Sequence, residues 1–155
     1  MAATACINFL GNYNILYIVK YLILFFIYSF FGVGAEVFFT SIHDYIKYRD
    51  IAFRGRSYLW MFPLYGCAGI IIEPLYNLIL SVPFILRGFI YMAVIFAAEF
   101  SYGLLLKLII KRCPWEYKSK WAVMGVVRID YLPFWLVFGY VLELIYRGFT
   151  AITIY

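Results

Sequence analysis

Four long stretches of the chain consist almost entirely of apolar residues. They cover about residues 21–42, 58–80, 88–110 and 131–150. Each stretch approaches or exceeds the roughly 20 residues that an α-helix needs to cross a bilayer core. Backbone polar groups in lipid must be hydrogen-bonded within the protein, and runs of this length favour helices over barrel strands. The pattern predicts an all-α polytopic membrane protein, with residues 1–155 forming one four-helix transmembrane bundle.

Composition supports this prediction. Hydrophobic residues make up 66% of the 155 residues and charged residues only 14%, whereas roughly a quarter of a soluble domain is charged. A chain of this length cannot hide so much apolar surface in a single core, so the lipid bilayer is its expected partner. The 16 Tyr and 4 Trp residues also suit the interfaces between membrane and water.

Lysine and arginine gather in two of the segments that connect the spans. Segments 43–57 and 107–130 hold ten of the 13 basic residues, namely Lys47, Arg49, Arg54, Arg56, Lys107, Lys111, Arg112, Lys118, Lys120 and Arg128. The positive-inside rule places both segments in the cytoplasm and both chain termini on the non-cytoplasmic side of the membrane. Topology thus explains the net charge of +5, and no nucleic-acid partner is expected.

Each predicted span contains one glutamate, and the four are Glu36, Glu73, Glu99 and Glu143. A charged carboxylate at the bilayer centre costs about 3 kcal/mol or more, so such residues usually face the bundle interior and have a function. A glycine lies four residues from each one, in the pairs Gly32–Glu36, Gly69–Glu73, Glu99–Gly103 and Gly139–Glu143. Residues four apart share a helix face, and small residues let helices approach closely. Each glutamate is therefore predicted to point inward along a packing stripe.

Depth divides the four glutamates into two levels. At about 1.5 Å per residue, Glu36 and Glu99 fall in the cytoplasmic half of their spans, and Glu73 and Glu143 fall in the outer half. Arg87, at the outer end of the third span, lies near the level of Glu73. It is either a charge partner for Glu73 or Glu143, or an interfacial arginine that reaches the lipid headgroups.

The two halves of the chain align on these glutamates. The second and fourth spans share one spacing, Pro63-x-Tyr65-x3-Gly69-x3-Glu73-x2-Tyr76 and Pro133-x-Trp135-x3-Gly139-x3-Glu143-x2-Tyr146. The first and third spans share Tyr28-x6-Ala35-Glu36 and Tyr91-x6-Ala98-Glu99. Two interpretations stay open. One is a repeated helical hairpin, as in transporters whose substrate site lies between repeats, and the other is the easy alignment of apolar helices that contain few residue types.

Two aromatic residues share the predicted helix face of Glu143. Tyr131 and Trp135 recur at intervals of four residues before Gly139 and Glu143. Together with the four glutamates and Arg87 they are the candidates for an intramembrane polar site, although packing alone would also explain them.

The segment Cys113-Pro114-Trp115-Glu116-Tyr117 directly follows the third span. In one interpretation the proline ends the helix and the aromatic residues anchor the chain at the interface. In the other, Cys113, Pro114, Trp115 and Tyr117 belong to a cytoplasmic cap that folds over the level of Glu36 and Glu99.

No metal, cofactor or catalytic residue is expected. Cys6, Cys67 and Cys113 have neither the spacing of a redox pair nor that of a zinc site. No Glu-x-x-His pair indicates a di-iron bundle, and no nucleophile lies beside a base. The sequence therefore leans away from an enzyme.

Several motifs resemble those of a known family. They include Ala35-Glu36-Val37-Phe38-Phe39-Thr40, Pro63-x-Tyr65-Gly66, Glu99-Phe100-x2-Gly103 and Cys113-Pro114-Trp115-Glu116-Tyr117, and all lie between about residues 28 and 146. On these residues the chain resembles the transmembrane protein 229 family, part of a larger group labelled CmpB-like or ABC-transporter type IV. The resemblance implies a multi-pass membrane protein. Pro74 departs from the family pattern, in which a basic residue follows the glutamate.

Three functions are compatible with these patterns. The first is a small transporter or permease-like subunit whose glutamates bind a cation or protons, and it would need a partner ATPase because the sequence has no GxxxxGK[ST] motif. The second is an intramembrane enzyme that acts on lipid, and the third is a structural or accessory subunit whose glutamates hold the bundle together. Because four short spans form a small bundle, a homodimer or a larger membrane complex is expected.

Overall fold

The computed structural model describes the backbone of residues 2–153 and the side chains of residues 15–149. This part of the chain forms four long helices, α1 (Ala2–Tyr48), α2 (Met61–Ile79), α3 (Phe84–Ile110) and α4 (Leu132–Thr153). The stretches long and apolar enough to cross a membrane are Ile15–Tyr48, Met61–Ile79, Phe84–Ile110 and Ile129–Phe149. The predicted all-α fold with four spans is confirmed.

The first helix is longer than the hydrophobic pattern suggests. The sequence predicts a span over about residues 21–42, whereas α1 continues to Tyr48. His43, Asp44 and Lys47 interrupt the apolar run, but none of them is a proline that would break the helix. The helix therefore extends a polar face beyond the apolar span.

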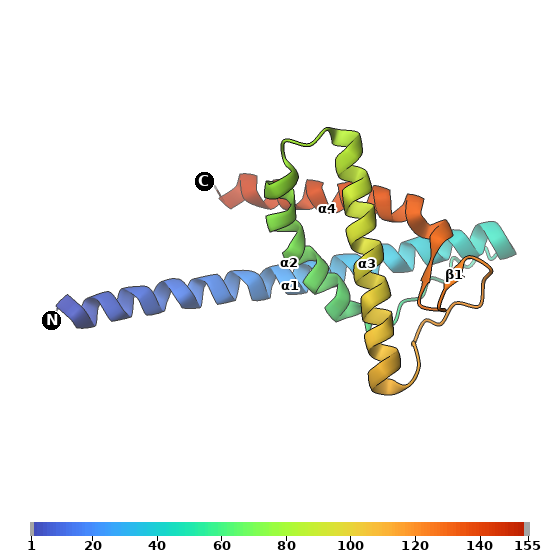
Figure 1. The fold of residues 1–155 in the computed structure, drawn as a ribbon, viewed down its shortest axis with the longest axis horizontal. Coiled ribbons are helices and arrows are strands. Elements are labelled where there is room, and N and C mark those ends of the chain that lie inside the picture. The colour runs from blue at the N-terminus through green and yellow to red at the C-terminus, as the bar shows by residue number, and fades with distance from the viewer. Residues whose placement is uncertain (1, 154–155) are drawn as a thin grey trace.

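The helices form two packed pairs (Figure 1). α1 packs against α2, and α4 packs against α3. In Figure 1, α1 and α4 run in opposite directions along the long axis of the molecule, and the hairpin of α2 and α3 crosses them steeply. The pairs also meet directly, because the rings of Phe39 in α1 and Phe134 in α4 lie 4.0 Å apart between centres.

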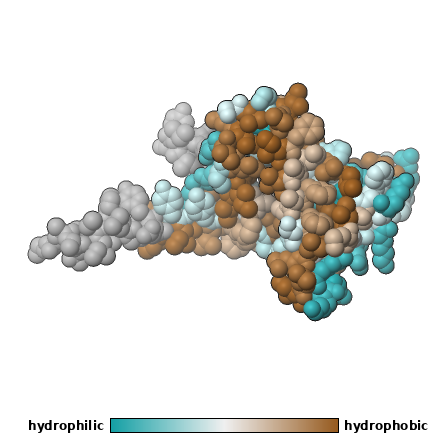
Figure 2. All heavy atoms as spheres, in the orientation of Figure 1, coloured by the Kyte–Doolittle hydropathy of each residue, from teal (hydrophilic) through white to brown (hydrophobic). Residues whose placement is uncertain are grey.

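The helix surface is largely apolar on the face that Figure 2 shows. Many large hydrophobic side chains of the described residues are exposed, such as Phe30, Phe38, Leu78 and Leu108. Polar atoms gather instead near the segments that connect the helices (Figure 2). This distribution fits helices that face lipid along their sides and water at their ends.

The segment between α3 and α4 contains a small β-hairpin that the sequence does not predict. Its strands β1 (Ala122–Val123) and β2 (Val127–Arg128) pair antiparallel, and the turn η1 (Ile129–Tyr131) leads into α4. Met124 and Gly125 take positive φ angles of 50° and 71°, which a tight hairpin turn requires. The hairpin rests on α3, since a Cβ atom on Gly103 would lie only 2.7 Å from Val126.

Aligned positions of the two hairpins make the same contact. Gly69 in α2 lies against Tyr28 in α1, and Gly139 in α4 lies against Tyr91 in α3. At either glycine a Cβ atom would overlap the tyrosine side chain. These are the positions that the aligned sequence patterns pair with one another, so the contacts favour a repeated hairpin over chance similarity.

Candidate functional site

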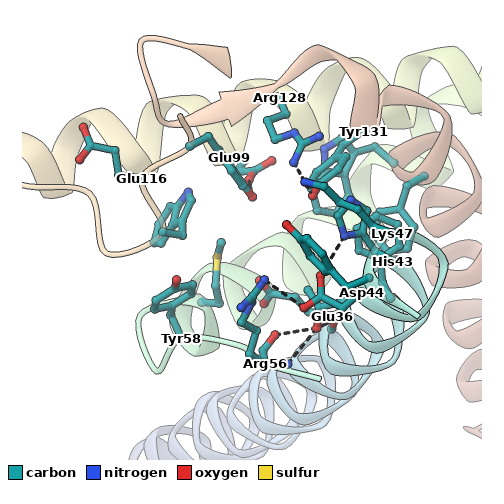
Figure 3. Close-up of a pocket in the computed structure, with 18 residues that line it drawn as sticks. Glu36, His43, Asp44, Lys47, Arg56, Tyr58, Glu99, Glu116, Arg128 and Tyr131 are labelled. Carbon is teal, nitrogen blue, oxygen red and sulfur yellow. Dashed lines mark hydrogen bonds and ion pairs between the residues drawn. The ribbon is translucent and has the colours of Figure 1, made fainter. Parts of the chain in front are cut away.

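A cavity of about 250 Å³ lies at what we call the basic end of the bundle, where the segments 49–60 and 111–131 connect the helices. Figure 3 shows side chains of α1, α3 and both segments around it. The lining residues are Glu36, Phe39, Thr40, His43, Asp44, Lys47, Tyr48, Arg56, Tyr58, Met61, Glu99, Trp115, Glu116, Tyr117, Arg128, Tyr131, Phe134 and Trp135. The cavity thus combines carboxylates, cations and aromatic rings.

Two of the predicted glutamates, Glu36 and Glu99, share this cavity, and we call them the inner glutamates. Glu36 comes from α1 and is half-buried. Its Oε2 atom accepts hydrogen bonds from the Ser57 hydroxyl at 2.6 Å and from the Tyr65 hydroxyl at 3.2 Å. Neutral hydroxyl groups are therefore the polar partners of this carboxylate.

Glu99 from α3 is more deeply buried, with 2% of its surface exposed. Its Oε1 atom accepts a long hydrogen bond of 3.5 Å from the Tyr117 hydroxyl. Its Oε2 atom is buried without a hydrogen-bond partner in the described part of the chain. Among the described side chains, no Lys, Arg or His nitrogen lies within ion-pair distance of Glu36 or Glu99.

Glu73 and Glu143 lie at the opposite end, and we call them the outer glutamates. Each has a cationic partner. The Glu73 carboxylate lies 3.3 Å from Lys20 Nζ, and the Glu143 carboxylate lies 3.3 Å from Arg87 and accepts a 2.8 Å hydrogen bond from the Tyr91 hydroxyl. The sequence leaves two interpretations open for Arg87. In the structure Arg87 pairs with Glu143, and the Arg87 side chain is only 13% exposed.

An apolar region separates the two levels. Two voids of about 20 and 30 Å³ follow the main cavity toward the outer end, and both are lined by Ala68, Ile95, Ala98 and Leu142. Each void has room for about one water molecule. The four shared side chains offer such a water no hydrogen bond, so the region forms an apolar barrier between the inner and outer glutamates.

The segment that follows α3 lies over Glu99. Cys113 and Trp115 are buried, and the Trp115 indole donates a 2.9 Å hydrogen bond to the Val126 carbonyl. Pro114 between them is half-buried. Burial raises the pKa of the Tyr117 hydroxyl above its usual range, and the Glu99 carboxylate raises it further, so this hydroxyl stays a donor. The connecting segment thus contacts Glu99 through Tyr117, and its role as a cap stays a prediction.

Cys113 carries a free thiol, and burial raises its pKa, so the thiol stays protonated. Cys67 is also free and is exposed, whereas Cys6 lies outside the described side chains. No group of three His, Cys, Asp or Glu side chains suited to a metal ion occurs among the described residues.

Tyr131 and Trp135 also line the cavity, although the sequence places them on the face of Glu143. Tyr131 accepts a 3.0 Å hydrogen bond from Arg128, and Trp135 is buried beside the inner glutamates rather than the outer ones. The turn of η1 and the start of α4 bring both residues to the basic end.

The sequence patterns do not distinguish the charged residues at the mouth of the cavity. Asp44 lies 3.1 Å from His43 and 3.0 Å from Arg56, and Lys47 follows one turn later. Glu36, Asp44 and Lys47 recur at helical spacing, so extending the predicted helix past residue 42 would have revealed this polar face.

The fold and this cavity define the class of the molecule: a polytopic α-helical membrane protein that encloses two carboxylates without cationic partners among the described side chains. The model of the CmpB family, described as "Putative ABC-transporter type IV", matches residues 23–154. The chain belongs to this family, and the matched region includes both the inner and the outer glutamates. No solved structure matches the chain.

Proposed function

We propose that this chain is a permease-like membrane subunit that takes a small cation from the basic end of the bundle into a site between Glu36 and Glu99. The observation that carries the proposal is the cavity shared by these two carboxylates, neither of which has a cationic partner among the described side chains. A ligand that brings positive charge would complete the site.

Charge balance supports a cation as the ligand. Burying a carboxylate without a partner costs several kcal/mol, and most of that cost is recovered when an opposite charge lies beside it. The outer glutamates already have Lys20 and Arg87 as partners, so their charge is balanced within the protein. A bound cation would therefore gain the most favourable electrostatic energy at the level of the inner glutamates.

The surroundings favour a monovalent or organic cation over a divalent metal ion. The described residues hold no cluster of three metal-ligating side chains. Aromatic rings from Trp115, Tyr117 and Trp135 line the cavity instead, and rings of this kind attract ammonium groups. Protons are the other cation that two carboxylates can take up.

The apolar barrier supports movement through the bundle rather than binding alone. The cavity is closed from the outer level by Ala68, Ile95, Ala98 and Leu142. Transporters built from repeats expose a central site to one side at a time. We infer that the described conformation is open toward the basic end and that the positive-inside rule makes this end cytoplasmic.

We infer further that, within its family, the chain belongs to the transmembrane protein 229 group, on the motifs around Glu36, Glu99 and Cys113. If the subunit works in an ABC-type complex, ATP is hydrolysed by a partner chain, since this sequence has no GxxxxGK[ST] motif.

Flux measurements on the purified full chain in liposomes test the proposal. The assay follows entry of protons with an internal pH dye and entry of labelled ethanolamine and monovalent metal ions. Glu36→Gln and Glu99→Gln should each lower the flux at least tenfold while keeping the thermal stability. Asp50→Asn is the control, because Asp50 lies on a connecting segment, pairs with Arg54 at 3.0 Å and does not line the cavity.

Two results would overturn the proposal. Flux that persists in both inner variants would show that these carboxylates do not bind the transported cation. Loss of folded protein in both variants, with no cation-dependent stabilisation of the wild type, would favour the structural or accessory subunit instead.

A further inference from the structure

We propose that the ligand of this cavity is an aminoalkyl phosphate, with a primary ammonium group between the inner glutamates and a phosphate group at the basic mouth. This inference rests on the proposed function: the ammonium group of this zwitterionic ligand occupies the cation site between the inner glutamates, and its phosphate group extends to the rim. It is carried by two observations, the incompletely bonded carboxylates in the depth of the cavity and the cations with unused donors at its rim.

The deep end of the cavity suits a primary ammonium group. Glu99 is 2% exposed, and its Oε2 atom accepts no close hydrogen bond from the described part of the chain, although the Trp135 indole N–H approaches this carboxylate. The hydroxyls of Ser57 and Tyr65 both donate to the Oε2 atom of Glu36. A primary ammonium brings three N–H donors to these oxygens, whereas a quaternary ammonium brings none.

The rim of the cavity suits an anion. Arg128 has five N–H donors, of which its contacts with Asp130 and Tyr131 use three, so two remain. Lys47 lines the same cavity, and no carboxylate lies within ion-pair distance of it among the described side chains. Figure 3 shows Lys47, Arg128 and Tyr131 together on one side of the cavity.

The spacing of the two ends fits a short linker. The Tyr117 hydroxyl lies 3.5 Å from Glu99, and the Arg128 guanidinium lies 5.7 Å from the centre of the same Tyr117 ring. One tyrosine side chain therefore separates the deep carboxylate from the arginine at the rim. A two-carbon chain between ammonium and phosphate can lie along this ring.

A phosphate is favoured over a carboxylate at the rim because more than one cation faces it. Asp130 occupies the fork formed by Nε and Nη2 of Arg128, so this arginine offers the two N–H groups that Asp130 and Tyr131 leave unused. Lys47 adds a point charge with no carboxylate partner among the described side chains, and together these donors match the several oxygens of a phosphate. Arg56 adds a third cation that it shares with Asp44.

The size of the cavity limits the ligand. About 250 Å³ is below the roughly 300–1,000 Å³ of sites for drug-sized ligands. It can hold an aminoalkyl phosphate but not acyl chains. The same chemistry can come from a free phosphate ester or from the headgroup of phosphatidylethanolamine, whose chains would remain in the bilayer.

Binding to the purified full chain in detergent, measured by calorimetry, tests the inference. The probes are ethanolamine, inorganic phosphate, phosphoethanolamine and phosphocholine. Phosphoethanolamine should bind at least tenfold more tightly than each of the other three. Lys47→Gln and Arg128→Lys should each weaken phosphoethanolamine at least fivefold and leave ethanolamine unchanged, whereas Glu99→Gln should abolish both.

Lys118→Gln on the same connecting segment is the matched control, because Lys118 is exposed and does not line the cavity. It should bind all four probes like the wild type. Lys47 is itself exposed, so its substitution should not disturb folding, and its result stands even if Arg128→Lys lowers the yield.

Nanodiscs distinguish the two sources of the ligand. If phosphatidylethanolamine in a phosphatidylcholine nanodisc weakens the apparent binding of phosphoethanolamine, the headgroup occupies the site. If it does not, the ligand is the free ester, and both results support the aminoalkyl phosphate.

Equal affinity for ethanolamine and phosphoethanolamine would overturn the inference, and binding of ethanolamine that depends on Glu99 would then leave the proposed function standing. Absence of any binding that depends on Glu99, together with cation flux that persists in the inner variants, would overturn both.

Discussion

The two inner glutamates occupy aligned positions of the two hairpins, and so do the two outer glutamates, but the inner and outer pairs have opposite surroundings. Lys20 and Arg87 neutralise Glu73 and Glu143, whereas Glu36 and Glu99 have no such partner among the described side chains. The outer level is thus complete within the protein, and the inner level is not. Glutamates in membrane spans of the same protein can thus be charge-balanced by a basic side chain at one depth and lack such a partner among the described side chains at another.

The largest expected effect on stability comes from removing the charge partner of Glu143 at the outer level. Arg87→Met leaves Glu143 buried without its charge partner, which should lower the free energy of unfolding by about 3–5 kcal/mol. Unfolding in mixed micelles measures this change. The double variant Arg87→Met with Glu143→Leu should return to within about 1 kcal/mol of the wild type. Wild-type stability of the single variant would mean that the pair does not hold the bundle.

The next effect concerns the barrier between the two levels. Leu142→Ala joins the two small voids and should cost about 3 kcal/mol in stability. It should also raise the passive proton leak of liposomes, because water can then reach Tyr91 and Glu143 from the inner cavity. Leu144→Ala on the same helix is the control, since Leu144 is 63% exposed. Equal leaks for the two variants would contradict a barrier at this position.

A smaller effect on stability is expected at the glycines that contact a tyrosine in each hairpin. Gly69→Ala and Gly139→Ala each place a Cβ atom against a tyrosine, at an expected cost of about 2 kcal/mol in both hairpins. Gly34→Ala is the control, because nothing lies within 4 Å of its Cβ position, and it should be neutral or stabilising by about 0.5–1 kcal/mol. Thermal unfolding measures all three, and a large cost in only one hairpin would weaken the case for a repeat.

The smallest effect distinguishes the two outer partners. Lys20 is 48% exposed, so Lys20→Met should change the free energy of unfolding by less than about 1 kcal/mol. The same unfolding assay in mixed micelles checks it. A loss as large as that of Arg87→Met would mean that exposure does not separate the two ion pairs.

Much of this arrangement could be predicted from residue spacing alone. Apolar runs long enough to cross a bilayer core favour helices. The rise per residue of a helix then places Glu36 and Glu99 at one depth without any knowledge of tertiary contacts. These two residues line the same cavity, as their common depth allows. Helical geometry and hydrophobicity are local properties, which is why the sequence carries them.

Contacts between distant segments could not be predicted in the same way. Arg87 lies near the depth of both outer glutamates, and only the packing of α3 against α4 decides that Glu143 is its partner. The small hairpin over Gly103 depends on burial of Trp115 and Val126, which the sequence of the connecting segment does not reveal. Tyr131 and Trp135 are predicted to share the helix face of Glu143, but that they lie at the cavity of Glu36 and Glu99 depends on how the start of α4 packs.

The repeated hairpin has a consequence for the orientation of a ligand. Two identical hairpins facing one another would present the same groups from both sides, and a ligand between them could bind equally well in either direction. Here Tyr65 donates to Glu36, whereas Trp135 occupies the aligned position and Tyr117 from the connecting segment donates to Glu99. The groups around the two inner carboxylates are therefore not related by two-fold symmetry, so a ligand between Glu36 and Glu99 would meet different partners on its two sides.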